Sequence, residues 1–186
     1  MPEFTRLTDE SFNVAPYLKP DPGRVAYWQS KIPGPRIGFT WKGGAPQTGS
    51  HERSLRIGQL AQLFKIDASW VCLQYGDVWR EVEEMKSFDL FYDAAAIEDF
   101  DEQINLTAAC DLVVSVVQTS VHTAGALGVP TFCLTPSRRP WKFPAGENMP
   151  WHPSVRQFHQ TDSWTSVIAE VGKEITDWLT AKRVAA

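Results

Sequence analysis

The sequence predicts an α/β fold: a Rossmann-like, three-layer domain with a mostly parallel sheet. Three observations favour it. Short apolar segments alternate with amphipathic ones along most of the chain. The most apolar of them, residues 112–117, reads as a strand buried on both faces, which is typical of parallel sheets. Residues 163–181 repeat apolar side chains at helical spacing. Strands that alternate with helices imply right-handed crossovers, with helices on both faces of the sheet.

The elements follow in order. The first 35 residues are rich in proline and irregular, apart from one short helical stretch over 21–32, so they predict an arm or linker ahead of a domain at residues 36–186. Runs of apolar residues predict strands over 36–41, 69–74, 88–92, 112–117, 130–134 and 155–159. Amphipathic spacing predicts helices over 57–65, 78–86, 99–110, 119–127 and 163–181.

Composition limits the function. A chain of 186 residues is long enough for one well-buried domain. The net charge is −4 and no Lys/Arg run reaches five, which argues against nucleic-acid binding. No apolar run approaches the roughly 18 residues of a membrane span. The N-terminus lacks a secretory pattern, so a cytoplasmic location is expected. The cysteines lie in apolar stretches without metal-ligand spacing and predict buried, reduced thiols: Cys72, Cys110 and Cys133.

In open parallel sheets, ligands bind beyond the carboxyl ends of the strands, where the strand order reverses. That rule directs attention to the loops that follow the predicted strands, and the long loop 135–154 should lie at the same edge. The loops in question are 41–54, 74–77, 93–98 and 117–122.

The stretch SVVQTSVHTAGALGVP, residues 115–130, contains the first candidate site. A strand ends and a helix begins there, and the first N–H groups of a helix lack internal partners and attract anions. Thr119 and Ser120 could cap the helix or donate to a phosphate, and His122 could donate to an anionic oxygen. The alternative is a plain helix cap with a hydrogen-bonded core histidine, and the residues alone leave both open.

The loop FTWKGGAPQTGSHERS, residues 39–54, makes the second case. Its glycines let backbone N–H groups approach a ligand, and Lys42 or Arg53 could neutralise phosphate charge. It matches neither a Walker A motif nor a GxGxxG fingerprint, and a surface loop has the same composition. Elsewhere, Asp99 and Asp101 spell DxD, for which acidic capping of a helix is a simpler explanation than metal binding. Loop tryptophans could stack on a sugar or base, or simply pack: Trp41, Trp141 and Trp151.

Residues 111–137, DLVVSVVQTSVHTAGALGVPTFCLTPS, resemble the C-terminal half of GT-B glycosyltransferases. The likeness is to a bacterial group with a heptosyltransferase-like domain, often joined to tetratricopeptide (TPR) repeats. It extends through RIGFTWKGG…ERSL, VCLQYG, DFDEQINLTAACDLV and MPWHPSVRQFHQTDSW, and covers most of residues 15–170. The resemblance implies one half of a GT-B fold that binds a nucleotide-diphosphate sugar as donor substrate, without metal or cofactor.

The resemblance also implies which residues act. His122 would stabilise the donor during catalysis. The implied donor contacts are Thr40, Lys42, Gly43, Arg53, Gln74, Gln118, Thr119, Ser120, His122 and Lys142.

Two departures from the group's pattern bear on activity. Val117 stands where the group has Asp, and Gln118 stands where it has Asn. A GT-B enzyme also has a second domain that supplies the sugar acceptor's site and the catalytic base, so a separate or missing N-terminal GT-B or TPR domain is an expected partner. The alternative is a nucleotide-sugar-binding module without turnover. A Rossmann oxidoreductase is disfavoured because no GxGxxG follows a strand.

Overall fold

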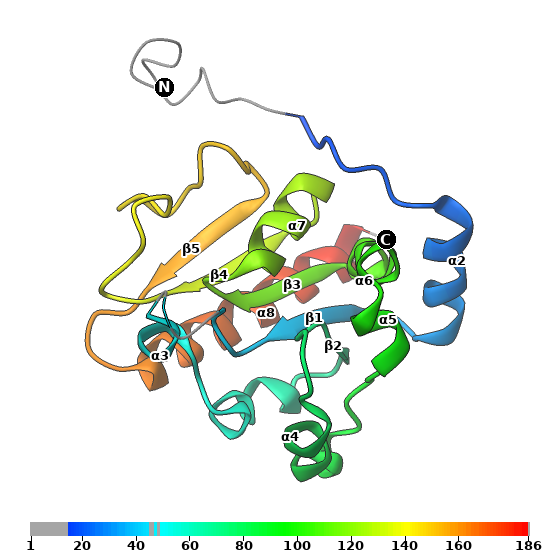
Figure 1. Ribbon diagram of the computed structural model, residues 1–186, viewed down its shortest axis with the longest axis horizontal. Coiled ribbons are helices and arrows are strands. Elements are labelled where there is room, and N and C mark those ends of the chain that lie inside the picture. The colour runs from blue at the N-terminus through cyan, green and yellow to red at the C-terminus, as the bar shows by residue number, and fades with distance from the viewer. Residues whose placement is uncertain (1–14, 45–46, 48, 186) are drawn as a thin grey trace.

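The computed structural model describes residues 15–44, 47 and 49–185. Its sheet has five strands, all parallel, in the order β2-β1-β3-β4-β5 (Figure 1). This architecture confirms the predicted Rossmann-like α/β fold. The strands are β1 (Arg36–Thr40), β2 (Ser69–Cys72), β3 (Leu112–Val116), β4 (Thr131–Thr135) and β5 (Val155–His159).

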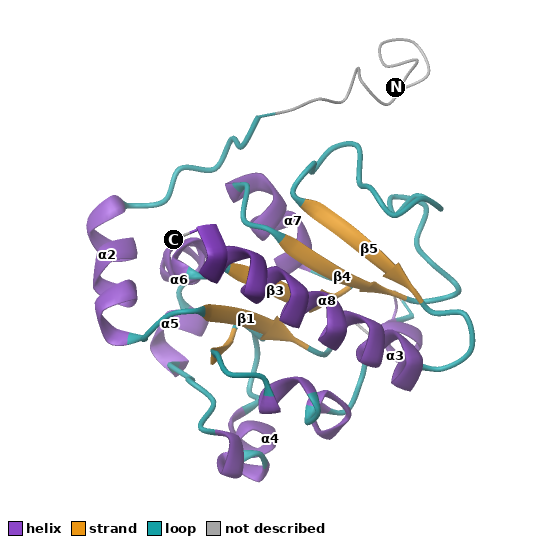
Figure 2. Cartoon of the chain, turned by 180° about the vertical axis from the view of Figure 1, so that it is seen from behind, coloured by secondary structure: helices purple, strands orange, loops and turns teal. Residues whose placement is uncertain are grey.

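Helices cover both faces of the sheet and make a three-layer structure. The α-helices are α2 (Pro22–Lys31), α3 (Ser50–Arg53), α4 (Trp79–Glu84), α5 (Ala94–Glu98), α6 (Phe100–Ala109), α7 (Thr119–Leu127) and α8 (Trp164–Ala185). Short 3-10 helices are η3 (Ile57–Leu60), η4 (Leu63–Lys65) and η5 (Lys86–Phe88). Helix α8 lies across one face, as Figure 2 shows, whereas α6 and α7 lie on the other.

Two large hydrophobic clusters fill the space between these layers. All five residues of β3 and all five of β4 are buried, as expected of strands covered on both sides. On one face the strand side chains pack with η3, η4 and the inner stripe of α8, which includes Val167, Val171 and Ile175. On the other face they pack with α2, α5, α6 and α7. The two clusters thereby pack the sheet between its helices and leave the loops at its carboxyl edge to form the candidate site.

Three local predictions were wrong. Residues 88–92 do not form a strand: Asp89 has a φ of 50°, which breaks the extended conformation, and Phe91 alone bridges to Val71. Residues 57–65 form two short 3-10 helices rather than one helix, with the helix-weakening Gly58 inside the first. The loop predicted at 93–98 is largely helix α5, because Asp93 accepts a hydrogen bond from the backbone N–H of Ala96 and caps it.

The described part of the predicted arm packs on the domain. Arg24 in α2 forms a two-pronged ion pair with Glu102 of α6, and the backbone N–H of Asp21 donates to Asn105. The arm's first 14 residues lie outside the described residues, and the domain boundary at residue 36 stays a prediction.

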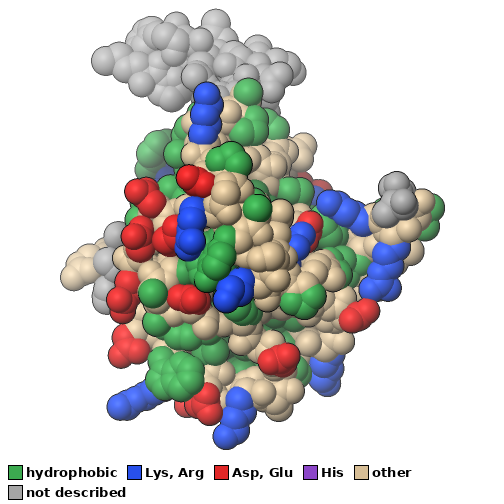
Figure 3. Space-filling view, turned by 90° about the vertical axis from the view of Figure 1, so that its right-hand side faces the viewer, with side chains coloured by type: hydrophobic (Ala, Val, Ile, Leu, Met, Phe, Trp, Pro, Cys, Tyr) green, Lys and Arg blue, Asp and Glu red, His purple; other side chains and the backbone are tan. Residues whose placement is uncertain are grey.

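The three cysteines are free and buried, and burial raises the pKa of each thiol to about 12. No helix within the described residues is long and apolar enough to cross a membrane. On the face shown in Figure 3, acidic and basic side chains are mixed.

Candidate functional site

The strand order reverses between β1 and β3, so the crevice favoured for ligands lies beyond the ends of these two strands. The hydroxyls of Thr40 and Ser115, near the ends of these two strands, are 2.7 Å apart and fully buried, and neither residue lines the cavities described below. A cavity of about 410 Å³ lies beside the start of α7 and is called the phosphate cavity below, after the ligand that we propose for it. It is lined by Gly44, Arg53, Tyr75, Val117, Gln118, Thr119, His122, Pro140, Lys142 and Phe143.

Helix α7 begins at this cavity directly after β3. Gln118 occupies the N-cap position but its side chain makes no capping hydrogen bond. The residue is only 7% exposed, and neither its amide oxygen nor its amide nitrogen has a hydrogen-bond partner among the described residues. A buried amide without partners is costly, and native proteins rarely retain one unless something else satisfies it. The N-terminus of α7 therefore combines the first backbone N–H groups of a helix, which attract anions, with a buried side-chain amide that has no partner among the described residues.

Two basic side chains line the same cavity. Arg53 is 9% exposed and lies against the backbone of Gly43, where a Cβ atom would come within 2.5 Å of its Nε. A side chain at position 43 would therefore displace the Arg53 side chain from this position. Lys142 comes from the long loop after β4. A helix N-terminus with two nearby cations is suited to an anion such as a phosphate.

His122 also lines the phosphate cavity, one turn into α7, and its ring lies 5.5 Å from that of Phe143. Its Nδ1 is 3.2 Å from Nε2 of His152, which the long loop after β4 supplies. Burial, and then the neighbouring His152 and Lys142, lower the pKa of His122 from 6.5 to about 4. Burial also lowers the pKa of His152. Both rings are therefore neutral at pH 7.

A second cavity, of about 270 Å³, adjoins the first and is called the nucleoside cavity below, after the ligand part that we propose for it. Tyr75 and Thr119 line both. Its walls come from the end of β2 and from α5, α6 and α7, and they are Tyr75, Ile97, Glu98, Phe100, Gln103, Thr107, Thr119, Ser120 and Thr123.

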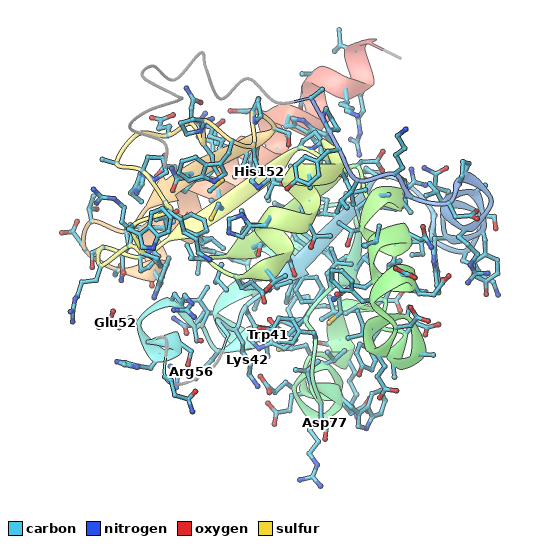
Figure 4. All side chains as sticks on the ribbon, turned by 45° about the horizontal axis from the view of Figure 1, so that its top comes forward. Trp41, Lys42, Glu52, Arg56, Asp77 and His152 are labelled. Atoms are coloured by element: carbon cyan, nitrogen blue, oxygen red, sulfur yellow. The ribbon has the colours of Figure 1, made fainter. Side chains whose placement is uncertain are left out.

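Other predicted site residues brace the loop after β1. Gln74 is buried and its Oε1 accepts from the backbone N–H groups of Trp41 and Lys42 at 3.0 and 2.8 Å. The Lys42 ammonium forms an ion pair with Glu81, away from the phosphate cavity, and the backbone N–H of Gly43 donates to Ser54. In Figure 4 Trp41 and Lys42 lie well apart from His152.

The remaining candidates are accounted for individually. Asp99 caps α6 by accepting from two backbone N–H groups. Trp41 is buried, Trp151 is partly buried, and Trp141, next to Lys142, is 90% exposed. Thr48 in the loop after β1 lies outside the described residues.

Sequence reasoning missed Tyr75 and His152. Tyr75 directly follows Gln74 in a loop that the sheet-edge rule had selected, so its position was a usable signal. His152 lies 30 residues from His122 and no spacing rule connects them.

Comparisons with known proteins bear on the fold. No protein-family model matches the sequence. Protein FlbA of Caulobacter vibrioides is 32% identical over 176 residues, which covers 87% of this chain and 29% of FlbA. The structure of E. coli ADP-heptose lipopolysaccharide heptosyltransferase II superposes with a TM-score of 0.62 and 19% identity, covering 91% of this chain and 55% of that one. A glycosyl transferase family 9 structure from Veillonella parvula gives 0.55 and 14%, covering 85% and 46%.

The chain therefore has a glycosyltransferase-like fold. It spans about half the length of these solved structures and less than a third of FlbA.

Proposed function

We propose that this chain is the donor-binding half of a metal-independent glycosyltransferase and that it binds a nucleotide-diphosphate sugar. The observation that carries the proposal is the buried amide of Gln118, unpartnered among the described residues, at the start of α7 in a cavity with two basic side chains. A diphosphate offers acceptors for the helix N–H groups and the amide NH₂ of Gln118. A sugar hydroxyl can donate to its amide oxygen. The likeness in fold to glycosyltransferases supports the same conclusion.

The residues around the phosphate cavity suit the chemistry of glycosyl transfer. As the glycosidic bond breaks, negative charge develops on the departing nucleotide diphosphate. Donors already fixed in place stabilise that charge without reorganising at the moment of reaction. The N-terminus of α7, Arg53 and Lys142 would supply this stabilisation, and His122 would donate from the ring nitrogen that His152 leaves free.

The nucleoside cavity would hold the ribose and base, because it adjoins the phosphate cavity at Tyr75 and Thr119. The hydroxyls of Ser120 and Thr123 and the carboxylate of Glu98 provide hydrogen-bonding groups for a sugar edge. Ile97 and Phe100 provide apolar surface for a base.

The sugar acceptor and the catalytic base would come from outside this chain, as the resemblance to two-domain GT-B enzymes implies. Val117 favours the second candidate, a binding module without turnover. It lines the phosphate cavity as an apolar residue, 3% exposed, where the related group has a carboxylate. Under either candidate the same donor site is expected.

Isothermal calorimetry with ADP, UDP and GDP tests the proposal, with the matching nucleosides as controls. We expect at least one diphosphate to bind with a micromolar to millimolar Kd and to raise the melting temperature, since binding to the folded state stabilises it. The nucleosides should bind more weakly. Absence of binding by all three diphosphates at millimolar concentration would overturn the proposal.

Incubation of the same chain with radiolabelled nucleotide sugars and candidate acceptors then addresses transfer. We expect donor binding without transfer, because an acceptor hydroxyl must be held in line and within reach of a base. Robust transfer by the chain alone would contradict the assignment of acceptor site and base to another domain.

A further inference from the structure

We propose that His152 is a positioning residue: it fixes the orientation and proton arrangement of His122 and shares with it one proton that is taken up when a phosphate anion binds. The ligand part of this inference rests on the proposed function. The contact between the two rings does not, and it can be tested without any ligand. His122 and His152 are called the imidazole pair below.

The geometry of the imidazole pair determines which nitrogen faces a ligand. Nδ1 of His122 and Nε2 of His152 are 3.2 Å apart, a hydrogen-bond distance. In neutral rings one nitrogen must donate and the other accept, so the tautomer of one ring sets that of the other. Because Nδ1 of His122 is engaged, Nε2 is the nitrogen left for a ligand in the phosphate cavity.

The fold holds His152 tightly in this place. The residue is 4% exposed, its backbone N–H donates to the carbonyl of Met149 at 3.0 Å, and its ring stacks on Tyr17 with an interplanar angle of 26°. Helix α7 approaches it closely: a Cβ atom on Gly125 would lie 2.5 Å from Cγ of His152. Glycine inside a helix is less favourable than alanine. Helix α7 thus has a residue of low helix propensity, Gly125, at the position that packs against the His152 ring.

The charges around the pair make its protonation depend on the ligand. The titratable and charged groups around it are Lys142 from the long loop and Arg53 from α3, which line the same cavity as His122, and Tyr17, whose ring stacks on His152. Burial first, and then His152 and Lys142, hold the pKa of His122 near 4 in the free protein. A phosphate anion reverses the local charge and raises the pKa of the pair. The pair then takes up one proton from solvent. One proton stays in the hydrogen bond between Nδ1 of His122 and Nε2 of His152. Both outer nitrogens now carry an N–H, and the one at Nε2 of His122 faces the anion.

The first experiment uses no ligand. Long-range ¹H–¹⁵N NMR spectra of the whole chain report the tautomer of each histidine ring. Two substitutions make a matched pair. His152→Phe keeps a ring for stacking and removes the hydrogen bond, whereas His152→Gln places an amide group near the position of Nε2. We expect a single tautomer for His122 in the unsubstituted chain, a mixture in His152→Phe, and recovery of one tautomer in His152→Gln.

The second experiment measures proton uptake by calorimetry with ADP in two buffers of different ionisation enthalpy. We expect uptake that increases between pH 7.5 and 6, is absent in His122→Ala, and is strongly reduced in His152→Phe. By analogy with residues that orient metal ligands, ADP should bind about tenfold more weakly to His152→Phe and recover in His152→Gln.

The outcomes separate the two claims. If ADP, UDP and GDP all fail to bind, the proposed function fails, while the NMR result still decides the role of His152. If ADP binds and His152→Phe changes neither the His122 tautomer nor the proton uptake, the inference is overturned. If His152→Phe does not fold, an NMR pH titration of the unsubstituted chain decides: independent titration of the two rings near pH 6.5 overturns the inference, and coupled titration at lower pH supports it.

Discussion

The two sides of the crevice contain similar residues and use them differently. The loop side, made by the loop after β1 and the end of β2, contains Gln74 and Lys42, and the helix side, made by α7 and the loop after β4, contains Gln118 and Lys142. On the loop side Gln74 accepts two backbone hydrogen bonds and Lys42 is paired with Glu81. On the helix side the Gln118 amide has no partner among the described residues, and Lys142 lines the phosphate cavity.

The difference shows what makes a polar residue at a sheet edge available to a ligand. Both glutamines follow a strand and both are buried, so neither residue type nor burial separates them. What separates them is whether the fold already satisfies their hydrogen bonds. A satisfied amide contributes to folding, whereas an unsatisfied one destabilises the free protein and contributes only when a ligand is present.

The largest effect is expected from Gln74→Leu on the loop side. This substitution leaves the backbone N–H groups of Trp41 and Lys42 without their acceptor, and each buried unpaired donor costs about 1–3 kcal/mol. We expect the free energy of unfolding to fall by about 3 kcal/mol in urea denaturation. A loss below about 1 kcal/mol would mean that other groups can accept hydrogen bonds from these two N–H groups and that Gln74 is not needed to hold the loop after β1.

Gln118→Leu is the matched substitution on the helix side, and its sign should be opposite. Removing an amide without partners relieves a desolvation penalty, so the free energy of unfolding should rise by about 1 kcal/mol. At the same time the affinity for ADP should fall by about tenfold, since a hydrogen bond to a charged group contributes about 1.5–3 kcal/mol. Urea denaturation and calorimetry on the same preparation measure both. Lower stability with unchanged affinity would make Gln118 a structural residue.

The sequence predicted the fold well because the alternation of strands and helices is a property of long segments. The failures are local. Asp89, with its left-handed φ, ended a strand that the apolar residues around it predicted. At the candidate site, sequence reasoning selected segments that the structure brings to the cavities lined by α7, but it could not rank their residues. Lys42 is paired with Glu81, which lies 39 residues away in the sequence, and Gln118 has no partner for its amide among the described residues. Both facts depend on which groups the tertiary structure brings near. His152 could not be predicted for the same reason.

A smaller and gradual effect is expected from pH. The folded-state pKa of His122 is lowered to about 4, from 6.5 in the unfolded chain, and that of His152 is also lowered. Groups with depressed pKa values stabilise the fold above pH 6.5, and this contribution is lost as the pH falls from 6.5 through about 4. We expect a loss on the order of 1 kcal/mol after allowance for solvent screening.

Urea denaturation at pH 7.5, 6 and 5 measures this slope. The slope should flatten in His122→Leu and stay unchanged in His51→Gln, which alters an exposed histidine of α3 on the loop side. An equal slope in both variants would show that the helix-side histidines are not the source of the pH dependence.

The smallest effect is expected on the affinity for ADP when each of the two lysines, Lys142 and Lys42, is replaced in turn. Lys142→Met removes a cation from the phosphate cavity and keeps a side chain of similar length. We expect the Kd for ADP to rise about fivefold, because an exposed charge pair contributes about 1 kcal/mol or less. Lys42→Met should change the Kd by less than about twofold, because its ammonium is paired with Glu81 and lines a different cavity. Both variants lose one positive charge, so they alter the long-range field equally and any difference between them is local. Calorimetry at low and high salt completes the test: the Debye length is about 10 Å at 0.1 M ionic strength and about 3 Å at 1 M, so the effect of Lys142→Met should shrink as salt rises. Equal effects of the two substitutions would place the diphosphate against the loop side as well, and would require Lys42 to leave Glu81 when the ligand binds.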